Sequence, residues 1–174
     1  MLKAAIIMGS DSDLGVLSAA AKVLEQFKVP FEIKILSAHR TTEAALSFAA
    51  DAESNGFGVI IAGAGAAAHL PGVLAAATAL PVIGVPVNAT PLAGMDALLS
   101  IVQMPPGIPV ATVGVNNAKN AGLLAVQVLS LTEKRLRTEF KADREMMKAG
   151  VLAKNAELEK IGYRKYLEKT EKKK

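Results

Sequence analysis

The sequence predicts one α/β domain, with a parallel sheet covered by helices on both faces. Three observations lead to this prediction. Short apolar runs bounded by turn residues recur along the chain, amphipathic helical patterns separate them, and the runs are rich in Val, Ile and Ala. Strands that alternate with helices favour βαβ units, and nearly continuous apolar runs are typical of strands buried on both faces.

Five strands are expected, at residues 4–8, 31–36, 59–62, 82–87 and 110–113. Helices are expected at residues 12–28, 41–55, 70–80 and 94–102, and from about 117 to 148. In the first helix, Leu14, Leu17 and Leu24 fall on one stripe. The second has Thr41 or Thr42 as a candidate N-cap and Gly56 at its end.

The C-terminal segment has a further helical pattern, from Val151 to Lys169, after an interruption at Gly150. We therefore expect a single catalytic domain over residues 1–150 and a C-terminal helix over residues 151–174. Apolar residues of this helix, among them Leu158 and Leu167, need burial, although the sheet already has its helices. Packing on a neighbouring subunit and packing across its own domain would both bury them.

Charge is distributed unevenly along the chain. Residues 1–131 hold six Lys and Arg against eight Asp and Glu, whereas residues 132–174 hold fourteen against eight. The basic tail could contact nucleic acid or be a solvated helix end, and it lacks the aromatic pattern that stacks bases. We expect neither nucleic acid nor a membrane as partner.

With no signal-peptide pattern and no cysteine, the sequence predicts a cytoplasmic protein without disulfides.

Polar side chains are concentrated in loops that follow the predicted strands. The first loop contains Ser10, Asp11, Ser12 and Asp13 at the start of a helix. Its hydroxyls and free amides could hold a phosphate or several hydroxyls. The two carboxylates favour ribose hydroxyls or an amino-bearing ring. An N-cap without any ligand is the alternative.

The second loop contains His39 and Arg40. The first 131 residues hold two histidines and this single arginine. Arginine presents a rigid fork of donors that matches phosphate or carboxylate, and histidine can give and take one proton near neutral pH. Ligands of open parallel sheets bind at the carboxyl edge. We therefore expect His39 and Arg40 in a small-molecule site.

The third loop, residues 63–72, contains a Gly-x-Gly-x-x-Ala core. A dinucleotide site also requires an acid at the end of the next strand, and residues 80–87 contain none. Rather than a dinucleotide site, the small residues indicate a loop whose backbone amides can approach a compact substrate. His69 would be a second polar contact or would orient the loop. Two histidines without cysteine leave few metal ligands, so we expect neither a metal nor an organic cofactor.

Taken together, the ordered motifs resemble one known family. They are residues 9–13 (GSDSD), 37–41 (SAHRT), 62–72 (AGAGAAAHLPG), 84–87 (GVPV), 98–105 and 109–113. The chain is similar over roughly residues 4–130 to the bacterial, class I 5-(carboxyamino)imidazole ribonucleotide mutases of de novo purine biosynthesis. This resemblance implies a flavodoxin-like three-layer sandwich with a central parallel sheet and an extra C-terminal helix. It also implies a homo-octamer.

The resemblance further implies an isomerase that moves a carboxylate from nitrogen to the C4 carbon of a ribonucleotide without metal, ATP or organic cofactor. His39 would be the proton shuttle, Arg40 would bind the ribose phosphate part, and the loop from Gly63 to His69 would enclose the transferred carboxylate or carbon dioxide. The expected substrate-binding residues are Ser10, Asp11, Ser12, Asp13, Ser37, Ala38, Arg40, Gly63, Ala64, Gly65, His69 and Leu70.

Three positions depart from the family pattern. Ala66 stands where glycine is usual, Thr42 where proline is usual, and Leu14 where an aromatic residue is common. None of them removes a candidate catalytic group. The related carboxylases, which use free carbon dioxide, commonly carry lysine in place of Arg40, so Arg40 favours the mutase. A carboxylase and a non-catalytic nucleotide-binding α/β module are the alternatives.

Overall fold

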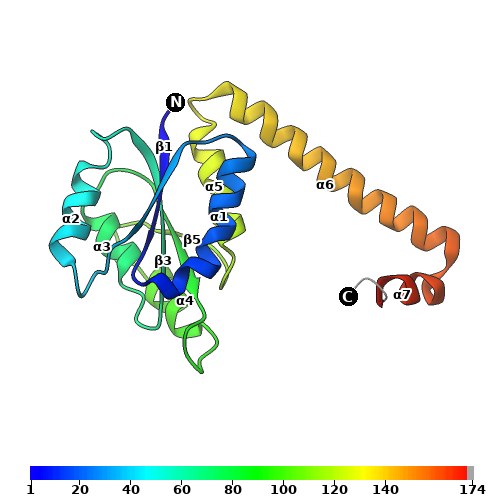
Figure 1. Cartoon of the computed structure of the whole chain (residues 1–174), viewed down its shortest axis with the longest axis horizontal. Coiled ribbons are helices and arrows are strands. Elements are labelled where there is room, and N and C mark those ends of the chain that lie inside the picture. Colours follow the sequence, from blue (N-terminus) through cyan, green and yellow to red (C-terminus); the bar gives the residue numbers. More distant parts are fainter. Residues whose placement is uncertain (172–174) are drawn as a thin grey trace. The chain divides into compact units, whose positions relative to one another are not determined.

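A five-stranded parallel sheet in the order β2-β1-β3-β4-β5 is the centre of the computed structural model, which describes residues 1–171 (Figure 1). The strands are β1 (Lys3–Met8), β2 (Phe31–Ile35), β3 (Phe57–Gly65), β4 (Val82–Val87) and β5 (Ala111–Thr112). The chain leaves β1 toward one edge through β2 and toward the other through β3. This is the flavodoxin-like strand order, which opens a crevice at the carboxyl ends of β1 and β3. The predicted fold class is confirmed.

Helices cover both faces of the sheet. Figure 1 shows α1 (Leu14–Gln26) and α5 (Ala118–Leu129) on one face, and α2 (Thr42–Asp51), α3 (Leu70–Ala76) and α4 (Met95–Val102) on the other. On the second face, alanines and branched aliphatic residues make most of the core, together with Phe57. Among them are Ala5, Ile7, Ile60, Ala62 and Val82 from the strands, with Ala45, Ala49, Leu70, Leu74, Ala97 and Ile101 from the helices.

Close packing on the first face depends on two glycines. A methyl group on Gly63 of β3 would lie 2.6 Å from Leu17 Cδ2 of α1, and one on Gly122 of α5 would lie 2.9 Å from Val23 Cβ. Real Cβ atoms do not approach so closely, so a side chain at Gly63 would force Leu17 to move, and one at Gly122 would press on Val23 and the backbone of Ala20. The close contact between Leu17 and Gly63 holds the amino end of α1, and with it the loop after β1, against the sheet.

Strand β3 is longer than the sequence predicts. Residues 63–65, expected in a loop, continue the strand and pair with β4, Gly63 with Val85 and Gly65 with Val87. The apolar signal stops at Ala62 because glycine has low strand propensity in isolation. Pairing with β4 and packing against α1 outweigh this propensity.

The C-terminal helices also differ from the prediction. The pattern expected to be helical from 117 to 148 is broken between α5 and α6 (Lys134–Ile161). Ser130 Oγ donates to the carbonyl of Gln127 and Thr132 Oγ1 to that of Leu129, and such local bonds compete with a continuing helix. The interruption expected at Gly150 is wrong, since α6 runs through it. One glycine costs a helix only about 1 kcal/mol relative to alanine.

The chain divides into two units, one ending at Leu136 and one beginning at Arg137. The second consists of most of α6, Gly162 with φ +77°, and α7 (Tyr163–Glu171). The expected C-terminal helix therefore begins at Lys134 rather than Val151, and residues 172–174 of that prediction lie outside the described residues. Within residues 1–171, no helix combines the length and apolar character needed to span a bilayer.

Candidate active site

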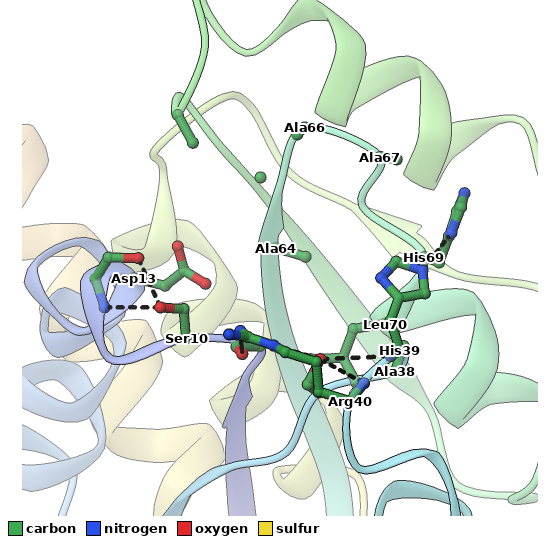
Figure 2. Close-up of a pocket in the computed structure, with 15 residues that line it drawn as sticks. Ser10, Asp13, Ala38, His39, Arg40, Ala64, Ala66, Ala67, His69 and Leu70 are labelled. Carbon is green, nitrogen blue, oxygen red and sulfur yellow. Dashed lines mark hydrogen bonds between the residues drawn. The ribbon is translucent and has the colours of Figure 1, made fainter.

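A pocket of about 250 Å³ lies at the carboxyl edge of the sheet, in the crevice that the strand order creates (Figure 2). Loops after four strands form its walls. The lining residues are Gly9, Ser10, Ser12 and Asp13 after β1, Ser37 to Arg40 after β2, Ala64 to Ala67 with His69 and Leu70 at the end of β3 and after it, and Ala89 after β4. Ten of the twelve expected substrate-binding residues, and His39, line this pocket.

The loop after β1 is organised by Ser10. Its Oγ accepts from the backbone N–H of Ser12 at 3.3 Å, which caps the short 3₁₀ turn Asp11–Asp13. Ser12 Oγ also donates to Ser10 Oγ at 3.0 Å. The N-cap suggested by the sequence is therefore present, and the same serines face the pocket. Capping and ligand binding are compatible here.

Asp13 is the one buried carboxyl group of this loop, with 6% of its surface exposed. Burial raises the pKa of the Asp13 carboxyl, a backbone hydrogen bond involving Ser10 lowers it, and the negative charge of Asp11 raises it again. The net shift is upward. A buried carboxylate at the pocket wall pairs most favourably with a donor from a ligand, such as a hydroxyl or amino group.

Arg40 joins the loop after β2 to the loop after β1. Its Nη2 donates to the carbonyl of Gly9 at 2.9 Å, and its Nε lies 3.5 Å from Ser37 Oγ. Ser37 is fixed in turn, since its N–H donates to Thr41 Oγ1 at 2.8 Å. These contacts set the direction of the guanidinium, and its remaining N–H groups can bind an anion.

The two histidines meet across the pocket wall. His39 Nε2 and His69 Nδ1 are 2.8 Å apart, and the ring centroids are 5.0 Å apart at an interplanar angle of 88°. Both side chains are exposed, and Figure 2 shows them approaching each other from facing loops. The structure thus gives His69 a specific neighbour, which the sequence could not identify.

Small side chains line the wall beside the histidines. Ala64, Ala66 and Ala67 contribute methyl groups to this wall, and the buried side chain of Leu70 also lines the pocket. Ala66 has φ +52°, a left-handed backbone conformation that glycine adopts more easily. A methyl group on Gly65 would lie 2.6 Å from Ala89 Cβ, so the loop after β4 closes tightly on the end of β3.

Two expected residues lie elsewhere. Asp11 lines an adjoining hollow with Ile35, Arg40 and Thr41, and Gly63 is covered by Leu17 of α1. Their roles in binding stay predictions. The sequence missed Ala89 because alanine carries no chemical signal, although its place after β4 indicates the same edge.

The part of the chain that the structure describes contains no group of three or more His, Asp or Glu able to hold a metal ion.

Comparison with known proteins matches this chain to one family. The profile of the AIR carboxylase family (AIRC) matches residues 3–150. The chain is 60% identical over 168 residues to the N5-carboxyaminoimidazole ribonucleotide mutase of Pyrococcus abyssi, covering 97% of each chain. It is 54% identical over 171 residues to the enzyme of the same name from Thermotoga maritima, covering 98% of this chain and 100% of that one.

A solved structure supports the fold. The crystal structure of Treponema denticola PurE superposes with a TM-score of 0.82 at 31% sequence identity, covering 89% of this chain and 97% of that chain. These comparisons extend over nearly the whole length of each relative.

Proposed function

This chain belongs to the AIR carboxylase family, and on that premise we propose that its pocket performs the family's carboxylate transfer with His39 as proton shuttle. The reaction converts 5-(carboxyamino)imidazole ribonucleotide to 4-carboxy-5-aminoimidazole ribonucleotide in purine biosynthesis. In support, its relatives carry the name N5-carboxyaminoimidazole ribonucleotide mutase. The chain is accordingly an isomerase. The observation that carries the proposal is the meeting of His39, Arg40 and an alanine-lined wall in one pocket.

Each part of the pocket has a task in this reaction. Arg40, oriented by Gly9 and Ser37, binds the phosphate, and Ser10 and Asp13 bind the ribose. His39 protonates the carbamate nitrogen, whose bond to the carboxylate then breaks and releases carbon dioxide. The alanine-lined wall holds the carbon dioxide until the ring carbon attacks it. His39 finally takes the proton from that carbon, so one proton is given and one is returned.

Retention of carbon dioxide is the main contribution of the pocket walls. A molecule held beside its reaction partner reacts at an effective concentration far above that of the free solute. Ala64, Ala66 and Leu70 present carbon atoms and no competing nucleophile. We propose that no metal, ATP or organic cofactor takes part, because the reaction moves one proton and one carbon dioxide with no net oxidation or reduction.

The proposal extends to the assembly and its location. Apolar side chains of the C-terminal helices are exposed in the single chain, among them Met146, Val151 and Leu152, which favours burial on a neighbouring subunit. We propose a homo-octamer, as the family resemblance implies. The cytoplasmic location expected from the sequence stays a prediction.

A labelled substrate tests the proposed function. The purified protein is given 5-(carboxyamino)imidazole ribonucleotide with ¹³C in its carboxylate, in buffer freed of bicarbonate. We expect the C4-carboxylate to form and to keep the label. A product that forms only when unlabelled bicarbonate is added, and is unlabelled, would identify a carboxylase. Binding without turnover would identify a non-catalytic module.

A further inference from the structure

The contact between the two histidines constrains where their protons lie. A neutral imidazole carries one proton, so one of its nitrogens donates and the other accepts. At 2.8 Å, His39 Nε2 and His69 Nδ1 share a hydrogen bond, so a proton lies on one of these two atoms and not on both. The hydrogen bond made by one nitrogen of a histidine determines which tautomer is present.

We infer that His69 is a positioning residue, which holds a proton on His39 Nε2 and leaves His39 Nδ1 to exchange a proton with the substrate. The inference rests on the proposed role of His39. Because the two nitrogens of an imidazole point in diverging directions, a bond from Nε2 to His69 directs Nδ1 away from His69. His39 itself lines the pocket, so Nδ1 is the nitrogen available to a bound molecule.

The backbone of His69 is well suited to hold this partner in place. Its N–H donates to the carbonyl of Ala67 at 2.8 Å, and its carbonyl accepts from the N–H of Val73 at 3.0 Å. Pro71 in the first turn of α3 further restricts the chain. His69 Nδ1 is thereby presented from the loop after β3, opposite the loop that carries His39.

The proton balance of the reaction is simple in this arrangement. Protonated His39 carries hydrogens on both ring nitrogens, and His69 Nδ1 accepts from Nε2 in a charge-assisted hydrogen bond. The Nδ1–H bond of His39 breaks as an N–H bond forms on the carbamate nitrogen. Later the C–H bond of the ring carbon breaks and the Nδ1–H bond forms again. The Nε2–H bond persists throughout, so His39 is in the correct tautomer for the second step.

Two substitutions at His69 distinguish the effect of losing its hydrogen bond to His39 from the effect of losing its ring. His69→Asn places an amide near the position of Nδ1 and keeps a hydrogen-bonding partner. His69→Phe keeps a ring edge against His39 but has no nitrogen. We expect kcat to fall by roughly tenfold to hundredfold in His69→Phe, the range found when a metal-bound histidine loses the partner that orients it, with KM little changed. The kcat of His69→Asn should be at least about ten times that of His69→Phe.

The tautomer itself can be measured by ¹⁵N NMR of histidine-labelled protein, since the chain has only two histidines. In the wild type and in His69→Asn, neutral His39 should show a protonated Nε2 and an unprotonated Nδ1. His69→Phe should show a mixture of tautomers. Equal loss of kcat in both His69 variants, a main effect on KM, or an unchanged tautomer in His69→Phe would overturn the inference.

His39→Asn distinguishes this inference from the proposed function. If His39→Asn keeps wild-type turnover, the proposed proton shuttle is wrong and the role of His69 fails with it. If His39→Asn loses turnover and His69→Phe does not, only the role of His69 is wrong. We expect His39→Asn with His69→Phe to be no slower than His39→Asn alone, because the two residues act as one unit.

Discussion

At the scale of single residues, the pocket combines one oriented guanidinium group with one buried carboxyl group. Arg40 is oriented by the Gly9 carbonyl and Ser37, whereas Asp13 is buried. The sequence singled out both residues because each follows a strand. It could not determine their contacts, because a hydrogen bond between loops 31 residues apart depends on the strand order.

Arg40→Ala should weaken substrate binding through loss of the phosphate contact. A charge-assisted hydrogen bond contributes about 1.5–3 kcal/mol, so the dissociation constant should rise roughly tenfold to hundredfold, as measured by calorimetry. A riboside analogue without phosphate should lose much less. Equal losses for the phosphorylated and plain ligands would show that Arg40 acts only by joining the two loops.

Asp13→Asn should raise the thermal midpoint of unfolding at pH 7 while it weakens substrate binding. Because the folded-state pKa of Asp13 lies above its usual value of 3.8, the native protein binds this proton more readily than the unfolded chain. The resulting stabilisation is present in acid and is lost as the pH rises through the raised pKa. The advantage of the variant should therefore shrink as the pH falls toward 4.

Glu53→Gln is the matched control for that experiment, because Glu53 is an exposed carboxylate. Exposed substitutions usually change the free energy of unfolding by less than about 0.5 kcal/mol. If Asp13→Asn destabilises the protein at every pH, the Asp13 carboxylate makes contacts that outweigh its desolvation.

At the scale of elements, the strands were predicted more accurately than the long helix. Strand β4 has the predicted bounds, since a buried run between turn residues has a clear signal. The end of β3 was missed because glycines at 63 and 65 serve packing against Leu17 and Ala89. The course of α6 was missed because a single glycine is a weak helix breaker.

The two exposed glycines of the C-terminal helices should respond oppositely to alanine. Gly150 lies within α6, so Gly150→Ala should stabilise this helix by about 1 kcal/mol. Gly162 has φ +77°, so Gly162→Ala should destabilise the turn to α7 by about 1–2 kcal/mol. Circular dichroism during thermal unfolding measures both changes. Destabilisation by Gly150→Ala would mean that α6 is interrupted there.

At the scale of the whole molecule, the fold class and the edge that holds the pocket were both predictable from the sequence. Parallel strands order their loops at one edge, so the residues after β1, β2 and β3 converge. What covers the C-terminal helices was not predictable. Their exposed apolar residues, Tyr163 at 67% and Leu152 at 60% among them, are the observation on which the proposed packing against a neighbouring subunit rests.

Removal of the residues after Gly150 tests the proposed role of this segment in assembly. If the segment packs on a neighbouring subunit, the truncated protein should form a smaller assembly in light scattering. Its stability should also fall, by an amount that depends on protein concentration. Removal of residues 172–174 alone is the control and should change neither property. A truncated protein with full assembly mass and unchanged melting would show that the segment is a solvated appendage.

The activity of His39→Asn tests the central claim most directly, namely that one histidine in this pocket carries the proton of the carboxylate transfer. Substrate affinity should stay within about threefold of wild type, since Arg40, Ser10 and Asp13 remain, and this is less than a single hydrogen bond contributes. Turnover of 5-(carboxyamino)imidazole ribonucleotide should fall by at least about a hundredfold, the lower range for loss of a general acid–base group. A correctly folded variant with turnover near that of the wild type would contradict the account.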